Sequence, residues 1–156
     1  MQDERDHADV VAFPPLIYLT AFVLGLLLKF FLPPPISLPR AVSLIAGILL
    51  IIAAGAIAFA AFRQMARAQT NVNPSEPTHS IVTDGVFGFS RNPIYLSLTM
   101  LFSGANLLLD NLWGLFLLVP LVFIVQTGVV LREEKYLERK FGDQYLDYKK
   151  RVRRWI

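Results

Sequence analysis

The chain has 156 residues, of which 54% are hydrophobic and 17% charged, with a mean hydropathy of +0.50 and a formal net charge of +3. A water-soluble domain typically carries about 25% charged residues, so this composition excludes an ordinary soluble fold and a disordered chain. The absence of cysteine excludes disulfides, thiolate nucleophiles and cysteine-ligated metal, and two histidines are too few for a His-rich metal centre. We therefore expect a membrane protein with neither metal nor nucleic acid among its partners.

Four apolar stretches are candidates for membrane-spanning helices, which need about 20 residues each. They are residues 14–32, 41–62, 93–109 and 112–131, of which the third is short. Gly47 and Gly55 in the second stretch would let another helix approach closely, and Pro120 is expected to kink the fourth. We predict an all-α fold, a polytopic bundle of four transmembrane helices that forms a single membrane-embedded domain over residues 1–156.

The basic residues are distributed unequally between the two ends of this bundle. With four spans, both termini and the loop 63–93 lie on one side, together with 13 of the 15 lysines and arginines; Lys29 and Arg40 lie on the other. Cytoplasmic segments carry the excess of Lys and Arg in membrane proteins. We therefore expect both termini in the cytoplasm.

Two cytoplasmic segments remain. The loop 63–93 is longer than a connector requires, and long loops on a rigid scaffold often carry function. Residues 132–156 are expected to continue the fourth helix, break near Gly142 and form an amphipathic helix. One face of that helix is apolar, with side chains at helical spacing: Tyr145, Tyr148, Val152 and Trp155. We expect this helix on an anionic membrane surface, although it could also cover a site.

Two adjacent carboxylates, Glu133 and Glu134, follow Arg132 where the fourth helix leaves the membrane. Carboxylates there are costly to desolvate unless they are paired, and neither has a basic residue three or four positions away on its own helix. They are either solvated or paired with Arg91 or Arg63 from another segment, or they are held ready for a cationic ligand.

The stretch 79–95 is the second candidate. It contains Phe87, Phe89 and a turn in which Asn92 suits the cap and Pro93 the first turn of the next helix. This can be a capped loop with aromatic anchors, or an aromatic and amide-lined loop that would suit an adenosine-bearing cation.

No phosphate-binding motif is present, and no span has an ionisable residue near its middle, which disfavours a nucleotide-binding fold, a channel or a pump.

These segments contain two ordered motifs, H-x-[LI]-V-T-x-G-V-[YF]-x-x-x-R-[HN]-P-x-Y within residues 79–95 and E-E-x-x-L-x-x-x-F-G-x-x-Y-x-x-Y-K-K-R-V from Glu133 to Val152. Together, over roughly residues 70–152, they resemble the isoprenylcysteine carboxyl methyltransferase family, whose wider group includes the phospholipid N-methyltransferases. The resemblance implies an integral membrane methyltransferase that transfers the methyl group of S-adenosylmethionine to a lipophilic acceptor entering from the bilayer. It also implies that the cofactor motifs are residues 79–95 and 132–148.

The resemblance implies which residues hold the cofactor: His79, Ser80, Ile81, Val82, Phe87, Asn92, Pro93, Ile94, Tyr95, Glu133 and Glu134. Glu133 would meet the amino group of the cofactor, in agreement with a carboxylate that has no basic partner on its own helix. A carboxylate or thiolate acceptor needs no general base. For an amine acceptor, Tyr95 and Glu134 are the candidates.

Two positions depart from the family pattern. Asn92 replaces a histidine, and an amide does not titrate near neutral pH, so we expect no proton transfer there. Val129 replaces an arginine that faces the substrate carboxylate, which leaves Arg132 as the candidate substrate residue.

The acceptor is expected to be an isoprenylcysteine-type carboxylate, with a phospholipid amine or a small lipophilic thiol as alternatives. The tail of the acceptor is expected near Pro120. A non-catalytic membrane adaptor with the same fold is the alternative of another class, and the oligomeric state stays open.

Overall fold

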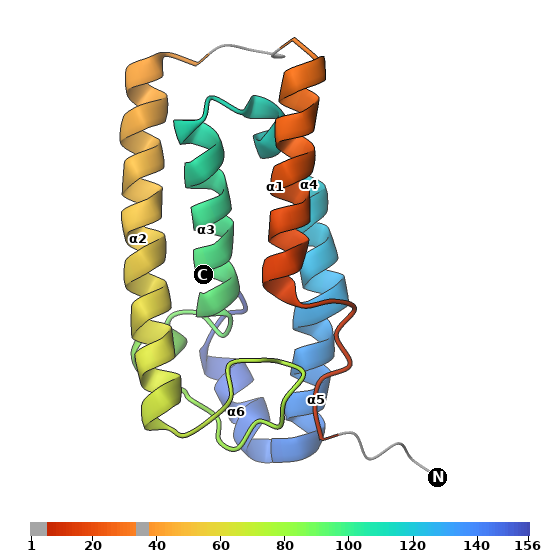
Figure 1. Ribbon diagram of the computed structural model, residues 1–156. Coiled ribbons are helices and arrows are strands. Elements are labelled where there is room, and N and C mark those ends of the chain that lie inside the picture. The colour runs from red at the N-terminus through yellow and green to blue at the C-terminus, as the bar shows by residue number, and fades with distance from the viewer. Residues whose placement is uncertain (1–5, 34–37) are drawn as a thin grey trace.

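A computed structural model describes residues 6–33 and 38–156, and this part of the chain is helical, without strands. Pro33, Pro34 and Pro35 follow the first apolar stretch, and the last two of these prolines lie outside the described residues. The elements, drawn in Figure 1, are α1 (Pro14–Phe31), α2 (Arg40–Arg67), η1 (Gly85–Gly88), α3 (Pro93–Leu108), α4 (Leu112–Val125), η2 (Gln126–Val130), α5 (Leu131–Phe141) and α6 (Asp143–Arg151).

Apolar helices lie at all four predicted positions. Three are long and apolar enough to cross a bilayer: Pro14–Phe31, Arg40–Arg67 and the continuous helix Leu112–Phe141. The remaining helix, Pro93–Leu108, lies at the third predicted position. It is apolar but has 16 residues, so the prediction that it crosses the membrane stays a prediction. The α2 helix runs five residues further than its apolar stretch, because polar residues extend it at the end that leads into the loop before α3.

Small residues lie where these helices pack closely in pairs. The α2 helix packs mainly on α3, and α1 on α4. A Cβ added to Gly47 would lie 2.9 Å from the carbonyl oxygen of Gly104, and one added to Gly25 would lie 2.8 Å from Cα of Gly114. Glycine is therefore required where the two backbones of each pair approach. The expectation for Gly55 was wrong, since no atom of the described residues lies within 4 Å of a Cβ there.

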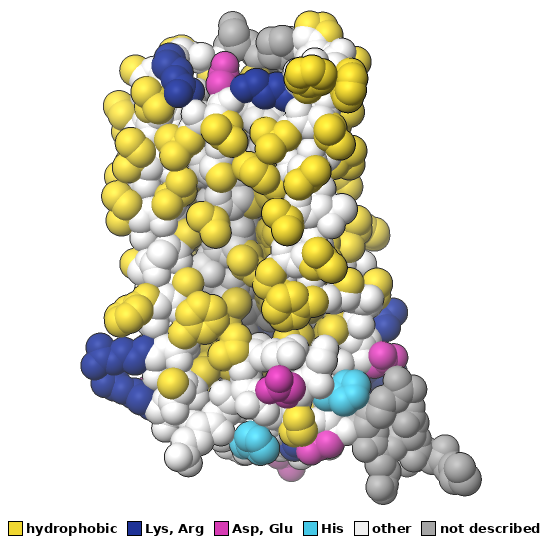
Figure 2. Space-filling view, in the orientation of Figure 1, with side chains coloured by type: hydrophobic (Ala, Val, Ile, Leu, Met, Phe, Trp, Pro, Cys, Tyr) yellow, Lys and Arg dark blue, Asp and Glu magenta, His cyan; other side chains and the backbone are white. Residues whose placement is uncertain are grey.

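The outer surface separates apolar from charged side chains. In Figure 2 hydrophobic side chains cover the long middle part of the visible face, while the charged side chains gather at its two ends. Leu19, Ile45, Ile52 and Val119 are each more than half exposed on the outside of their helices. Such a surface suits a hydrocarbon solvent, with the polar ends in the headgroup regions.

A buried polar cluster fixes the turn between α3 and α4. The side chains of Asn106 and Asn111 are fully buried, and Nδ2 of Asn111 donates to Oδ1 of Asn106 at 2.7 Å. Lys29 of α1 and Arg40 of α2 donate to two successive carbonyls at the C-terminal end of α3. Carbonyls at a helix end lack partners within the helix, so these two cations satisfy them and fix the depth of α3.

Candidate functional site

A cavity opens at the end of the bundle that carries the loop between α2 and α3, together with α5 and α6. It encloses about 810 Å³ of space that no atom fills, its open mouth included. The residues that line it come from the last turn of α2, the loop after α2, the first turn of α3, α5 and α6. Segments far apart in the sequence therefore meet here, at the end that the charge distribution predicts to be cytoplasmic.

The cavity brings together ten of the eleven residues expected to hold a cofactor: Ser80, Ile81, Val82, Phe87, Asn92, Pro93, Ile94, Tyr95, Glu133 and Glu134. His79 is not among the lining residues; its backbone N–H donates to Oγ1 of Thr70 at 3.1 Å. Further residues line the cavity that the sequence did not predict to hold the cofactor: Met65, Thr70, Asn71, Val72, Asn73, Pro74, Thr78, Arg91, Leu137, Tyr145 and Tyr148. Arg91 and the two tyrosines stood inside the two motifs, whereas residues 70–74 carried no chemical signal.

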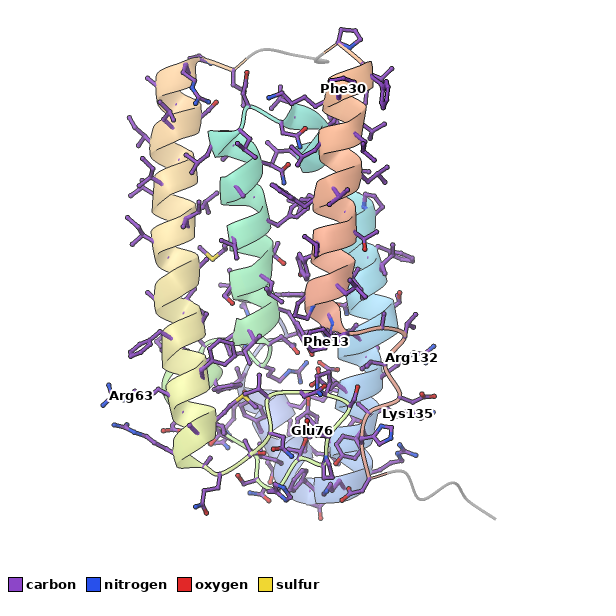
Figure 3. All side chains as sticks on the ribbon, viewed as in Figure 1. Phe13, Phe30, Arg63, Glu76, Arg132 and Lys135 are labelled. Atoms are coloured by element: carbon purple, nitrogen blue, oxygen red, sulfur yellow. The ribbon has the colours of Figure 1, made fainter. Side chains whose placement is uncertain are left out.

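Arg132, the candidate substrate residue, is not among the residues that line the cavity. Its guanidinium donates to the backbone carbonyl of Asp9 at 2.8 Å, and its side chain is 46% exposed. Figure 3 shows Arg132 and Lys135 pointing outward from α5, and Arg63 pointing outward from α2. Of the two arginines proposed as cross-helix partners of the glutamates, Arg63 is thus directed away from the site.

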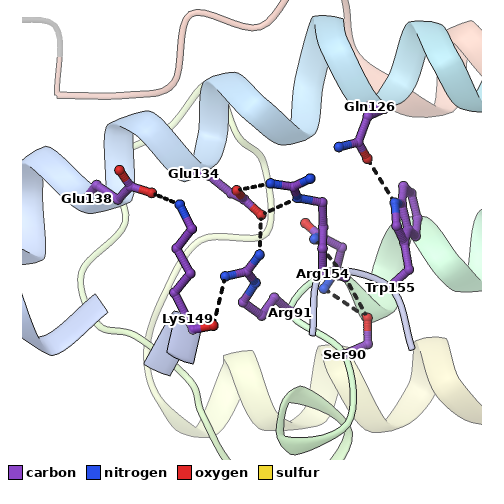
Figure 4. Close-up of polar contacts among 9 residues, drawn as sticks. Ser90, Arg91, Gln126, Glu134, Glu138, Lys149, Arg154 and Trp155 are labelled. Carbon is purple, nitrogen blue, oxygen red and sulfur yellow. Dashed lines mark hydrogen bonds and ion pairs between the residues drawn. The ribbon is translucent and has the colours of Figure 1, made fainter. Parts of the chain in front are cut away.

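Glu134 is held by two arginines (Figure 4). Nη2 of Arg91 donates to it at 2.9 Å, and Arg154 donates through Nε at 2.8 Å and Nη2 at 3.0 Å. The carboxylate is 5% exposed and the Arg91 side chain 6%. Among the interpretations of the paired carboxylates, an ion pair with Arg91 is therefore confirmed for Glu134, with Arg154 as a second partner that sequence reasoning missed.

Glu133 differs from its neighbour. Its hydrogen-bond partner is the Tyr95 hydroxyl, which donates to Oε2 at 2.8 Å. Within residues 6–33 and 38–156 no lysine or arginine forms an ion pair with it, although it lines the cavity. A carboxylate that faces a cavity with a phenol as its only described partner leaves acceptor positions available for a ligand.

A π-helical turn precedes the two glutamates and replaces the regular helix that the sequence predicted. It buries three successive residues, Gly128, Val129 and Val130. The carbonyl of Gly128 accepts a hydrogen bond from the backbone N–H of Val11 at 3.0 Å. Val129, where the family resemblance has an arginine, is completely buried in the apolar core with Tyr18. Turns of this type are frequent at functional sites, where they change the direction of the following side chains.

The expected C-terminal helix is shorter than predicted and packs differently. It ends at Arg151, and Tyr145 and Tyr148 are buried against protein instead of lying on a membrane surface. Burial raises the pKa of both phenols above its ordinary value, so they stay neutral. The Tyr148 hydroxyl donates to the carbonyl of Phe87 at 2.7 Å. Both tyrosines line the cavity, which agrees with the alternative interpretation, a helix that covers a site.

The tail segment, residues 152–156, follows α6 and forms hydrogen bonds with two other parts of the chain near the cavity. Its backbone carbonyls accept hydrogen bonds from residues 90–92 at 2.9 to 3.3 Å. One of the donors is the amide of Asn92, the residue that departs from the family pattern. Nε1 of Trp155 donates to Oε1 of Gln126 in η2 at 2.8 Å, as Figure 4 shows. The tail therefore joins the turn before α3 to the helix that carries the glutamates.

Comparisons with known proteins agree with the resemblance. A protein-family model described as phospholipid methyltransferase matches residues 42–144, from α2 to the start of α6. A Haemophilus influenzae protein named only as uncharacterized is 38% identical over 63 residues, which are 40% of this chain and 100% of that protein. No solved structure matches the chain.

Two methyltransferases match a shorter share of their length. The protein-S-isoprenylcysteine O-methyltransferase of Schizosaccharomyces pombe is 38% identical over 76 residues, 47% of this chain and 31% of that enzyme. Its namesake in Mus musculus is 35% identical over 83 residues, 48% of this chain and 26% of that enzyme. The match thus covers less than a third of either enzyme. Because the family model covers well over half of the sequence, the chain belongs to the phospholipid methyltransferase family.

Proposed function

We propose that this chain is an integral membrane methyltransferase that transfers the methyl group of S-adenosylmethionine to a lipophilic acceptor. The observation that carries the proposal is the difference between the two glutamates. Glu134 is fully paired with arginines, whereas Glu133 faces the cavity with a phenol as its described partner. An ammonium group is the natural partner of such a carboxylate, because a charge-assisted hydrogen bond is strong where water is excluded.

The residues around Glu133 fit the remainder of that cofactor. Ile81, Val82 and Phe87 supply apolar lining for a ring such as adenine. Asn71, whose Nδ2 donates to the carbonyl of Pro77, supplies an amide oxygen for a polar edge. His79, which does not line this space, is proposed to act through the loop that it helps to form.

The chain's own residues favour an acceptor that is already anionic. When bound, S-adenosylmethionine supplies an electrophilic methyl group. A carboxylate or thiolate can attack such a group without a base, so the protein has to align the two reactants and exclude water. An amine must lose a proton first, but the Tyr95 hydroxyl donates to Glu133 and Glu134 holds two guanidiniums. We infer that an isoprenylcysteine-type carboxylate suits this site better than a phospholipid amine.

The proposal includes a single domain of four spans with both termini in the cytoplasm. The position of α3 between α2 and α4 supports a fourth crossing, and the cavity lies at the end where the basic residues of the described part gather, Lys29 and Arg40 apart. An apolar groove between α1 and α4, lined by Leu16, Leu117 and Pro120, supports placing the acceptor's tail there. We expect Pro120→Leu to change the preferred chain length of the acceptor; an unchanged preference in methyl-transfer assays contradicts that placement.

The direct test is binding of S-adenosylhomocysteine to the detergent-purified chain, measured by calorimetry. Losing an ammonium–carboxylate pair in a shielded site costs about 2–5 kcal/mol, so Glu133→Ala should abolish micromolar binding. Glu138→Gln is the matched control, because it also removes a carboxylate from α5. Glu138 pairs with Lys149 and does not line the cavity. A folded wild-type protein that binds no S-adenosylhomocysteine would favour the non-catalytic adaptor instead.

A further inference from the structure

Arg91 has a hydrogen-bonding group that the proposed function does not use. Its Nη2 contacts Glu134 at 2.9 Å, and its Nη1 donates to the carbonyl of Lys149 at 3.4 Å. Its Nε is buried and has no partner in the described part of the chain. The side chain is 94% buried and lines the cavity. A buried donor without an acceptor is unfavourable, so this N–H is a candidate for contact with a ligand.

The charges around Arg91 do not balance. One carboxylate, Glu134, serves two guanidiniums, so the three groups together carry an excess of one positive charge. Arg154 is one-third exposed and keeps part of its hydration, whereas Arg91 does not. The unsatisfied positive charge therefore lies on the cavity side, where an anionic group would neutralise it.

Two opposite charges thus line the same cavity, Glu133 on α5 and Arg91 before α3. The amino-acid end of S-adenosylmethionine carries the complementary pair, an ammonium and a carboxylate on one carbon atom. We propose that Arg91 binds the α-carboxylate of the cofactor while Glu133 binds its ammonium, an inference that rests on the proposed function. Glu134 then positions Arg91, because it fixes the guanidinium beside the helix turn that carries Glu133.

The test compares two ligands that differ in the carboxylate alone: S-adenosylhomocysteine and its decarboxylated analogue, which keeps the ammonium. Calorimetry on the full chain should show that the wild-type protein prefers S-adenosylhomocysteine by at least about tenfold, as for a charge-assisted pair. Arg91→Gln should remove this preference and leave affinity for the analogue within about threefold. Arg91→Lys, which keeps the charge, should retain part of the preference, and a thermal melt of each variant establishes that it is folded.

Arg154→Gln is the matched control, because Arg154 also contacts Glu134 but does not line the cavity. It should keep the preference; a loss equal to that in Arg91→Gln would overturn direct contact. Persistence of the preference in Arg91→Gln would overturn the inference as well. A folded wild-type protein that binds both ligands equally overturns this inference alone, whereas one that binds neither overturns the proposed function with it.

A further arm separates the cofactor from the acceptor as the source of the anion. N-acetyl-S-farnesylcysteine and its methyl ester differ in the acceptor's carboxylate. If Arg91→Gln weakens binding of the acid relative to the ester and leaves the preference for S-adenosylhomocysteine intact, Arg91 serves the acceptor and the assignment to the cofactor is wrong. An unchanged ratio between acid and ester supports the assignment.

Discussion

Replacing Glu134 with glutamine is expected to destabilise the fold strongly. The carboxylate is 5% exposed and pairs with Arg91, which is 6% exposed. Removing one partner of a buried pair costs about 3–5 kcal/mol, because the other charge is left without compensation. Arg154 is 33% exposed and can be hydrated, so its lost contact adds little. For a chain of this length each kcal/mol lowers the melting temperature by about 2–4 °C, which gives a fall of roughly 6–20 °C.

The same substitution at Glu133 provides the control. Its described contact is a hydrogen bond from the Tyr95 hydroxyl, and the oxygen of a glutamine can still accept that bond. Glu133→Gln should therefore melt close to the wild-type protein. It should nevertheless lose S-adenosylhomocysteine binding. Thermal unfolding in detergent, followed by circular dichroism, measures the first effect, and calorimetry the second. Equal melting of the Glu134→Gln and wild-type proteins would refute the reasoning, and so would an equal loss in the two variants.

Two more predictions concern the scaffold. Gly114→Ala should lower the melting temperature, because the new Cβ would lie 1.8 Å from Oδ1 of Asn106, whereas Gly55→Ala has open space and should not; similar melting of the two would contradict the packing. Trp155→Phe removes the hydrogen bond to Gln126, which stabilises the tail segment by about 0.5–1.5 kcal/mol. Carboxypeptidase should therefore digest the tail segment of this variant faster than that of the wild-type protein. Unchanged digestion would show that this bond does not hold the tail.

The positions of the helices could be predicted because length and hydropathy alone decide them. The π-helical turn at 126–130 could not, since no local residue requires it. Its partners come from far away in the sequence: the N–H of Val11 reaches the carbonyl of Gly128, and the indole of Trp155 reaches Gln126. Periodicity also extended the last helix too far. The helix ends at Arg151 because the backbone beyond it bonds to residues 90–92.

The candidate site was predictable where a residue type conflicts with its surroundings. Two carboxylates at a membrane exit require water or partners, and that argument led to Arg91 or Arg63 as the candidate partners, of which Arg91 forms the pair. Residues 70–74 line the same cavity, but their polar side chains are ordinary for a loop, so only the path of the chain reveals them. Arg154 was missed because its charge resembled that of its basic neighbours; its bond to Glu134 depends on the fold of the tail.

Two adjacent glutamates have different roles here because neighbouring residues on a helix point about 100° apart. One direction from α5 leads to the tail and the turn before α3, where Glu134 joins two arginines; the other leads to Tyr95 and the cavity. A single glutamate could not do both, because the negative charge of a carboxylate that pairs with both Arg91 and Arg154 is already more than compensated. The doublet therefore combines one carboxylate that assembles the wall of the site with one that stays available to a ligand. Exchanging these contacts would require rotating the helix.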